Sequence, residues 1–162
     1  MRRRTWALRG QTPVQRCWDR YDRLSVMGAI TMSPHRKRLD ARFNVWHENI
    51  CTSHVVQFIK QLRQELRRPL VVILDRLAAH RSAARQLQNE GYKDIRFEWL
   101  PAYAPDLNPV EALWSHTKYS DLANFLPNDE HDLRRSVCQS IEVQRRQKHL
   151  LRSFFHAAKL KL

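Results

Sequence analysis

The sequence predicts an α/β protein in which helices flank a mixed β-sheet. Two segments, 23–32 and 38–46, alternate polar and apolar residues and are joined by the short turn SPHRK. Two later apolar runs of strand length, 70–75 and 95–100, alternate with amphipathic segments of helical period. A hairpin followed by a strand–helix–strand unit favours a sheet that contains both antiparallel and parallel neighbours.

The first two strands are predicted to form an antiparallel hairpin. RLSVMGAITM alternates over 23–32, and RLDARFNVW repeats the alternation over 38–46. A weaker strand pattern occurs earlier, in PVQRCW. Residues 1–13 are basic and read as an exposed segment with a turn at Gly10.

A helix is predicted after the hairpin, capped by Thr52 or Ser53 and stopped by Pro69. The next segment, PLVVILD, is a continuous β-branched run, which is typical of a strand buried on both faces. The helix has one apolar stripe, formed by Val55, Phe58, Ile59, Leu62 and Leu66.

The rest of the chain predicts a helix through SAARQLQNEG that ends at Gly91, then the strand IRFEWL. A helix begins at Pro109 and continues through ALWSHTKYSDLANF. After Pro127, a last long helix uses Leu133, Val137 and Ile141, and a short aromatic tail follows. Without repeats or a low-complexity linker, residues 1–162 are expected to form a single domain.

Composition narrows the function classes. The chain carries 29 Lys+Arg against 16 Asp+Glu, a formal charge of +13, which favours an anionic partner such as nucleic acid. The alternative is that the protein is basic without binding an anionic partner. Cys17, Cys51 and Cys138 lack paired spacing, which argues for a reducing compartment without a disulfide framework or a zinc site. With no long apolar run or signal-peptide pattern, we expect a cytoplasmic protein.

Asp75 is the most informative single residue. It ends the apolar run VVILD, and open α/β sheets place their sites at the carboxyl ends of strands. The competing interpretation is a turn or helix cap, since Asp is a common turn residue.

A second acid, Glu111, lies in the stiff stretch LPAYAPDLNPVEALW, where three prolines recur every fourth residue. Helix capping could explain these residues, with Asn108 as the N-cap, Pro109 at the first helical position and Glu111 completing a capping box. This leaves the rigid lead-in unexplained. Rigid placement matters when a carboxylate must meet another group, so we expect Glu111 to turn toward Asp75.

These residues resemble a known family. LDRLAAHRS and LPAYAPDLNPVEALWSHTK are similar to two signature blocks of DDE transposases, in the mariner-like branch of bacterial insertion sequences. The 35 residues between Asp75 and Glu111 are close to that branch's usual spacing of its second and third acids. RTWALRGQTP, RLSVMGAITMSP, VVQFIKQL and LLRSFFHAAKLKL also resemble family segments, in family order. The resemblance covers essentially the whole chain.

The resemblance implies a ribonuclease H-like fold and metal-dependent cleavage and strand transfer of DNA. Asp75 and Glu111 would be the second and third catalytic acids and metal ligands. Two Mg²⁺ ions, with Mn²⁺ as substitute, would lie about 4 Å apart and activate a water or 3′-hydroxyl. Arg and Lys side chains would hold the DNA backbone, with salt-sensitive affinity.

The resemblance also implies auxiliary roles for other residues of the two signature blocks. His80 would contact DNA or orient the site, or serve as a hydrogen-bonded structural residue. Asn108 would be a cap first and a site residue second, Trp114 a core residue, and Lys118 either a DNA contact or a solvated lysine. The expected DNA-binding residues are His80, Arg81, Ser82, Asn108 and Lys118.

The chain departs from the family pattern at its start. The family's first acid lies in an Asp-Glu-Ser-like block on a central strand just upstream of RRRTW, and this block and the end-recognising helix-turn-helix region are missing from the sequence. We therefore expect an N-terminally truncated domain, inactive alone, that acts on DNA as a homodimer or with a complementing polypeptide, near the nucleoid. The alternatives are a non-catalytic DNA-binding relic or regulator, and a ribonuclease H-like nuclease acting on RNA.

Overall fold

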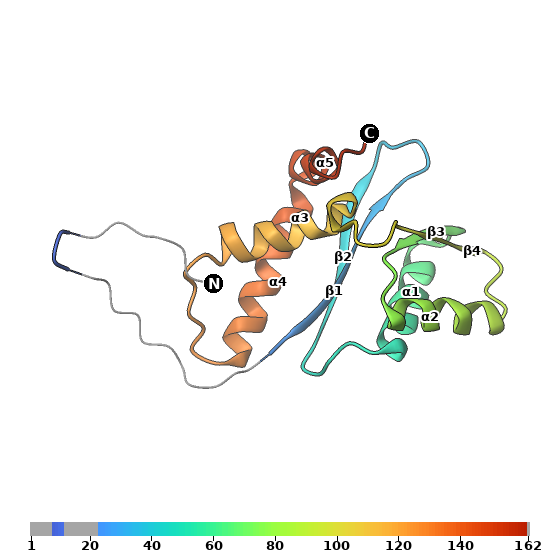
Figure 1. The fold of residues 1–162 in the computed structure, drawn as a ribbon, viewed down its shortest axis with the longest axis horizontal. Helices are drawn as coiled ribbons and strands as arrows, with labels where there is room; N and C mark the ends of the chain where they lie inside the picture. The colour runs from blue at the N-terminus through green and yellow to red at the C-terminus, as the bar shows by residue number, and fades with distance from the viewer. Residues whose placement is uncertain (1–7, 12–22, 162) are drawn as a thin grey trace.

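A computed structural model describes residues 8–11 and 23–161 (Figure 1). The element order agrees with the predicted one, whereas the weak strand pattern in PVQRCW lies outside the described residues. The elements are β1 (Ser25–Met32), β2 (Leu39–Trp46), α1 (Thr52–Leu66), β3 (Leu70–Leu74), α2 (Ala78–Asn89), β4 (Ile95–Trp99), a 3₁₀ turn (Pro105–Leu107), α3 (Pro109–His116), a π-helical turn (Thr117–Asp121), α4 (Glu130–Arg146) and α5 (Lys148–Ala157).

The four strands form two separate pairs within the described part of the chain. β1 and β2 are antiparallel, with Gly28 opposite Phe43, and β3 and β4 are parallel, with Val72 opposite Phe97. No ladder joins β1 to β3 in residues 23–161, so a mixed α/β fold is present with a partial sheet. Figure 1 shows the long β1–β2 hairpin between α3–α5 on one side and the α1–α2–β3–β4 unit on the other.

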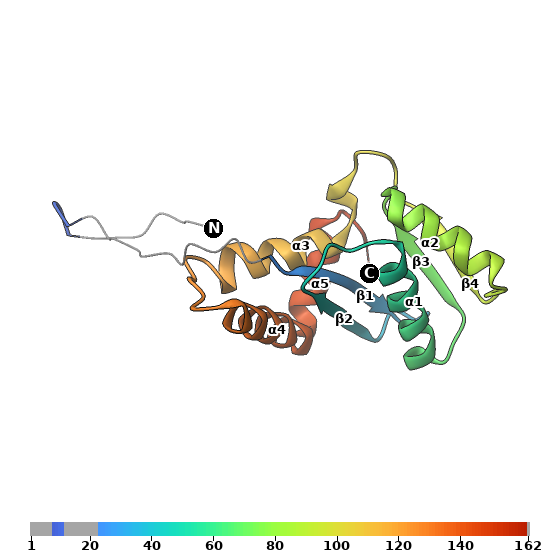
Figure 2. The same ribbon diagram turned by 90° about the horizontal axis from the view of Figure 1, so that it is seen from below.

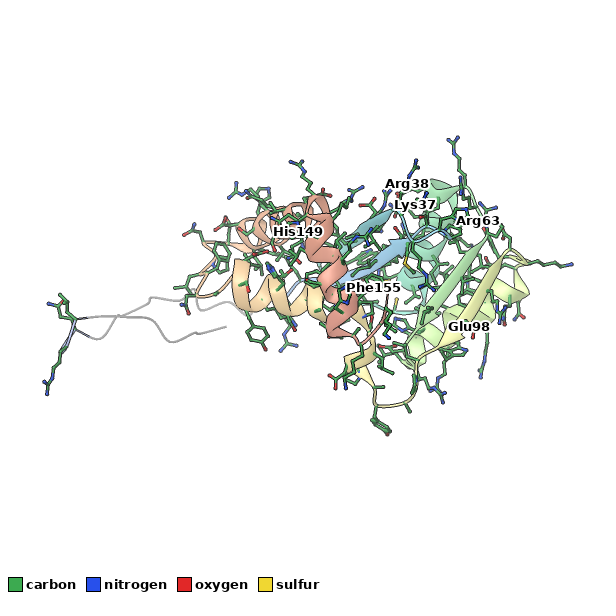
Figure 3. All side chains as sticks on the ribbon, turned by 90° about the horizontal axis from the view of Figure 1, so that it is seen from above. Lys37, Arg38, Arg63, Glu98, His149 and Phe155 are labelled. Atoms are coloured by element: carbon green, nitrogen blue, oxygen red, sulfur yellow. The ribbon has the colours of Figure 1, made fainter. Side chains whose placement is uncertain are left out.

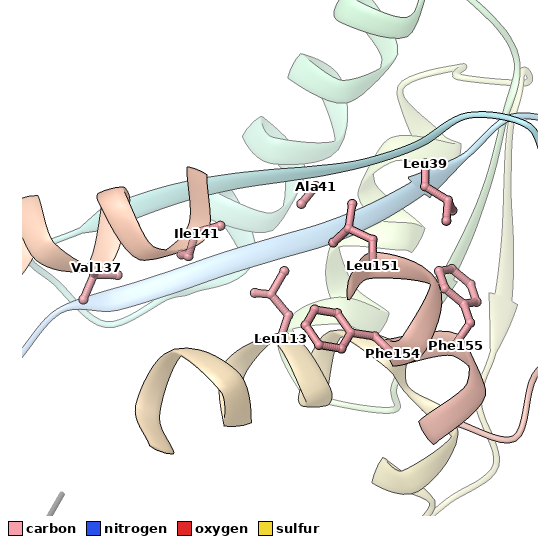
Figure 4. Close-up of a cluster of buried hydrophobic side chains, with 8 residues drawn as sticks. All are labelled: Leu39, Ala41, Leu113, Val137, Ile141, Leu151, Phe154 and Phe155. Carbon is pink, nitrogen blue, oxygen red and sulfur yellow. The ribbon is translucent and has the colours of Figure 1, made fainter. Parts of the chain in front are cut away.

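The first core lies between the β1–β2 hairpin and helices α3, α4 and α5 (Figure 4). The predicted aromatic tail is instead the amphipathic helix α5, because Leu151, Phe154 and Phe155 recur at helical spacing and all point into this core. Its buried members are Leu39, Ala41, Leu113, Val137, Ile141, Leu151, Phe154 and Phe155.

Trp114 belongs to the edge of this core, as predicted. A Cβ atom built on Gly28 of β1 would lie 2.8 Å from the indole Cη2 of Trp114. Gly28 therefore lets α3 approach the hairpin closely.

The second core lies between helices α1 and α2 and one face of β3–β4. Met27 of β1 packs against it, which makes the hairpin its neighbour. Figure 2 shows α1 and α2 in front of β3 and β4, and Figure 3, from the opposite side, shows the strands with Glu98 uncovered. The buried members are Val55, Val56, Ile59, Ala83, Leu87 and Ile95.

The prediction that the strand at 70–75 is buried on both faces is wrong. Val71 is 65% exposed and Ile73 is 62% exposed, on the face opposite α1 and α2. Helices α3, α4 and α5 pack on the hairpin instead, so this face of β3–β4 has no cover among the described residues.

Two predicted helix boundaries also change. The N-cap of α1 is Cys51 rather than Thr52 or Ser53, because the His54 side chain accepts the backbone N–H of Cys51 at 3.1 Å. The helix from Pro109 keeps α-helical form to His116 and then widens into the π-helical turn. There the hydroxyl of Thr117 accepts a hydrogen bond from Nε2 of the fully buried Gln144, at 2.8 Å.

Helix α2 begins at Ala78, four residues before the predicted segment SAARQLQNEG, and its predicted end at Gly91 is confirmed. Gly91 has φ +85° just beyond α2, a left-handed conformation that glycine adopts without strain. None of the helices in the described ranges combines the length and apolar character needed to cross a membrane.

Candidate active site

Asp75 follows the last residue of β3 and organises the start of α2. Its Oδ1 accepts the backbone N–H of Leu77 at 3.1 Å and lies 2.5 Å from Nδ1 of His80, in the first turn of α2. Because an ionised carboxylate only accepts, His80 Nδ1 is the donor. Asp75 is thus both a turn residue and an oriented, half-exposed carboxylate at the carboxyl end of a strand.

Glu111 lies in the first turn of α3 and is exposed. Asn108 caps the helix as predicted, since its side-chain oxygen accepts the backbone N–H of Val110 at 3.2 Å. The other half of the expected capping box is absent: the N–H of Asn108 donates to the carbonyl of Pro105 at 2.9 Å. Within residues 23–161 the Glu111 carboxylate has no hydrogen bond or ion pair, so helix capping does not explain it.

Two hydrogen bonds join the strand end next to Asp75 to Leu100, the residue that follows β4. The N–H of Leu100 donates to the carbonyl of Leu74 at 2.8 Å, and Nε of Arg76 donates to the carbonyl of Leu100 at 3.1 Å. Leu100 begins the proline-rich segment that leads to α3 and Glu111. The strand end that carries Asp75 is therefore tied to the start of the segment that carries Glu111.

Few side chains at the candidate site could bind a metal ion. No cluster of three or more His, Cys, Asp or Glu side chains able to hold a metal ion occurs among the residues that the structure describes. The acids at the candidate site are Asp75 and Glu111, and His80 occupies one oxygen of Asp75. Hard divalent cations take carboxylate oxygens, but these two acids alone do not form a metal centre.

A basic groove of about 450 Å³ lies beside Asp75, between α2 and β4. Sequence reasoning assigned Arg81 but missed Arg76, Arg85 and Trp99. The spacing of one helical turn between Arg81 and Arg85 could have identified Arg85 from the sequence. Trp99 needed the structure, because the parallel register places it opposite the residue before Asp75. The groove is lined by Arg76, Arg81, Ala84, Arg85, Gln88, Phe97 and Trp99.

The remaining predicted contacts are spread along the two helices. Ser82 is exposed on α2 next to Arg81 but is not among the residues that line the groove. Lys118 is exposed in the π-helical turn, roughly 10 Å along the helix axis from Glu111. The structure thus brings His80 to Asp75 and places Arg81 in the groove, while Asn108 caps the helix that carries Glu111 and Lys118 lies in the turn after that helix.

Asp40, the described acid of the hairpin, does not extend the site. Asp19 and Asp22 lie outside the described residues. Asp40 of β2 accepts a hydrogen bond from Arg145 Nε at 2.8 Å and is paired with Arg42 at 3.0 Å. Partial burial opposes its ionisation, but the hydrogen bond and charge of Arg145 outweigh this effect and lower the pKa of Asp40. Asp40 therefore joins β2 to α4.

Comparisons with known proteins agree with this architecture. A family described as the DDE superfamily endonucleases matches residues 1–134. No curated protein matches the chain at a significant level. A similar solved structure is the crystal structure of the Mos1 Strand Transfer Complex, with a TM-score of 0.57 at 13% identity. The match covers 98% of this chain and 46% of that one, so this chain spans less than half of its length.

The structural match confirms the predicted fold class, a ribonuclease H-like α/β arrangement, here with a partial sheet. The family match extends over both signature blocks and confirms the resemblance drawn from them. The chain belongs to the DDE superfamily of endonucleases.

Proposed function

We propose that residues 1–162 form the catalytic domain of an insertion-sequence transposase, which cleaves DNA phosphodiester bonds and transfers strands. Asp75 and Glu111 are its second and third catalytic acids. The observation that carries this proposal is the pair of hydrogen bonds that ties the Asp75 strand end to the segment leading to Glu111, whose carboxylate has no hydrogen bond or ion pair among residues 23–161.

In this proposal, the residues of the chain orient the catalytic carboxylates and attract the divalent cations and the DNA. His80 and the Leu77 N–H both donate to Oδ1 of Asp75 and fix the direction of its carboxylate. Together with a further acid from outside the described residues, Asp75 and Glu111 would hold the divalent cations, Mg²⁺ or Mn²⁺, which supply Lewis acidity and an activated oxygen nucleophile when bound. His80 therefore acts through Asp75 rather than as a direct DNA contact.

DNA is the proposed substrate, and the basic groove supports this assignment. None of the guanidinium groups of Arg76, Arg81 and Arg85 is ion-paired within the described ranges, so all three can meet phosphates. Trp99 offers a ring for stacking on an unpaired base. Ser82, Lys118 and the amide of Asn108 would extend the contact. The structurally similar Mos1 chain comes from a strand transfer complex, which agrees with this substrate. Such a protein would act in the cytoplasm, at the nucleoid.

We further propose that another polypeptide, or another copy in a dimer, completes the sheet. In the described part of the chain, β1 pairs with β2 and β3 pairs with β4, so the outer edge of each of these strands has no ladder partner. Free edges accept an extended segment through main-chain hydrogen bonds. A strand lying between β1 and β3 would join the pairs, and an acid near its end would supply a further ligand beside Asp75.

The test is DNA nicking and joining in Mn²⁺, for the chain alone and with a co-expressed segment that carries an Asp-bearing strand. We expect background activity alone and measurable activity after complementation. Asp75→Asn and Glu111→Gln should return it to background. Asp106→Asn, which alters an exposed acid in the same segment, should retain it. Activity of the complemented protein that survives Asp75→Asn would refute the catalytic assignment.

The second candidate is a non-catalytic DNA-binding protein, a relic or a regulator of a full-length transposase. It is favoured by the lack of a three-group metal cluster in the residues described. This function predicts salt-sensitive DNA binding in EDTA together with no cleavage, even after complementation. An RNA nuclease predicts cleavage of RNA in preference to DNA, and a substrate panel separates the three.

A further inference from the structure

A cluster of three reactive side chains lies at the N-terminus of α1, apart from the candidate active site. Sγ of Cys51 is 3.3 Å from Nδ1 of His54, and Nε2 of His54 is 3.1 Å from Oε1 of Glu48. The three side chains therefore form a thiol–imidazole–carboxylate chain. Neither proposed function uses it.

Local hydrogen bonds fix the tautomer of the imidazole. Nδ1 of His54 accepts the backbone N–H of Cys51 at 3.1 Å, so the proton of the neutral ring is on Nε2 and is donated to Glu48. The ring is 8% exposed and lies against Trp46, with ring centroids 5.1 Å apart. The basic nitrogen is thus held beside the sulfur.

The surroundings of the sulfur favour its anionic form. Cys51 is exposed, and its Sγ lies 3.1 Å from the hydroxyl of Ser53. The Ser53 hydroxyl, followed by the backbone N–H groups of His54 and Ser53, lowers the pKa of the Cys51 thiol. Glu48 is the charged group bonded to the imidazole, while the neighbouring His47 is engaged by Glu130 of α4.

Neither helix capping nor metal binding accounts for all three side chains of this cluster. Capping of α1 requires the bond between the Cys51 N–H and His54, but not the exposed carboxylate of Glu48 on the far side of the ring. A metal site is not supported, because no three-group ligand cluster is found within the described ranges. The combination of an exposed sulfur and a buried, oriented base is typical of an activated thiol.

We propose that Cys51 is a reactive thiol that exchanges with low-molecular-weight disulfides, with His54 as its base and Glu48 as a positioning residue. The thiol proton moves from Sγ to Nδ1 as the Nδ1 lone pair releases the backbone N–H of Cys51, and the sulfur lone pair attacks one sulfur of the disulfide. The new S–S bond joins Cys51 to that sulfur, and the old S–S bond breaks. The leaving thiolate takes the bonding pair and then the proton from the imidazolium.

The test measures the modification rate of each cysteine by mass spectrometry, on the full chain and between pH 6 and 9. The probes are iodoacetamide, which forms a thioether and releases iodide, and oxidised glutathione, which forms a mixed disulfide. Cys138 of α4 is the internal control, and Cys17 gives a separate peptide. Cys51 should react about tenfold faster than Cys138 at pH 7, with its rate profile displaced to lower pH.

Two variants separate base chemistry from helix capping. Glutamine caps well at the third helical position, so His54→Gln should keep α1 and lower the Cys51 rate about tenfold at pH 7. Glu48→Gln alters a carboxylate that is 73% exposed and should lower the rate about threefold without loss of structure. Circular dichroism checks folding. A Cys51 profile that matches Cys138, or one unchanged in both variants, would overturn the proposal.

Discussion

The two strand pairs of this protein contrast in how their faces are covered. The β1–β2 hairpin packs one face against α3, α4 and α5, and its opposite face is linked to α1 by the Arg42–Glu65 and Asn44–Gln61 hydrogen bonds. The β3–β4 pair is covered by helices on one face alone in the described structure. Parallel strands are usually buried on both faces, so the uncovered face of β3–β4 is the unusual one.

The two strand pairs also differ in their proposed roles, one structural and one catalytic. The hairpin pair carries an extensive core and no proposed catalytic residue. The β3–β4 pair carries Asp75 at its carboxyl end, beside a free edge and a basic groove. The candidate site thus lies where the fold is least complete, which agrees with the proposal that a further strand joins the two pairs.

The largest expected effect is in the first core. Leu151 is fully buried, so Leu151→Ala should lower the free energy of unfolding by about 3 kcal/mol through lost burial and a cavity. Urea unfolding measures it. Leu77→Ala removes the same atoms from an exposed site and should change stability by less than about 0.5 kcal/mol. Equal losses would show that α5 does not pack on the hairpin as described.

The contact between α3 and β1 should be the next most sensitive. Gly28→Ala places a methyl group against the Trp114 indole and should cost about 2 kcal/mol in unfolding free energy. In a Trp114→Phe background, the same substitution should cost clearly less, because the smaller ring frees the space. Additive effects of the two substitutions would contradict the close approach.

The charged junction between β2 and α4 should have a smaller, pH-dependent effect. The pKa of Asp40 is lower in the folded chain than its ordinary value of 3.8. Its stabilising contribution is therefore present above that value and is lost as pH falls toward the folded pKa. Asp40→Asn should lower unfolding free energy by about 1 kcal/mol at pH 7, with the difference shrinking below pH 4. A constant difference would refute the ion-pair explanation.

The smallest effect is expected on the uncovered face of β3–β4. Ile73→Thr keeps the β-branched shape on an exposed position, so unfolding free energy should change by less than about 0.5 kcal/mol. Ile59→Thr, at a buried position of α1, is the control for a true core site. If Ile73→Thr instead costs as much as Ile59→Thr, some part of the chain covers this face in solution.

Local sequence patterns were sufficient to predict most of the strands and helices and the acids at their ends. Alternation over 23–32 and 38–46 fixed the hairpin because one face of each strand has to be buried, and Asn108 and Gly91 marked helix ends through their own backbone chemistry. The proline-rich block likewise pointed to Glu111. These features depend on neighbours within a few residues, so their signal is local.

Tertiary structure alone decided which faces are covered and which side chains meet. The run VVILD predicts a strand, but the exposure of Val71 and Ile73 depends on where α3, α4 and α5 pack, which no local pattern encodes. The aromatic tail became α5 because the hairpin offered it an apolar face. The alignment of Trp99 with the end of β3 likewise required the parallel register, which long-range hydrogen bonds fix.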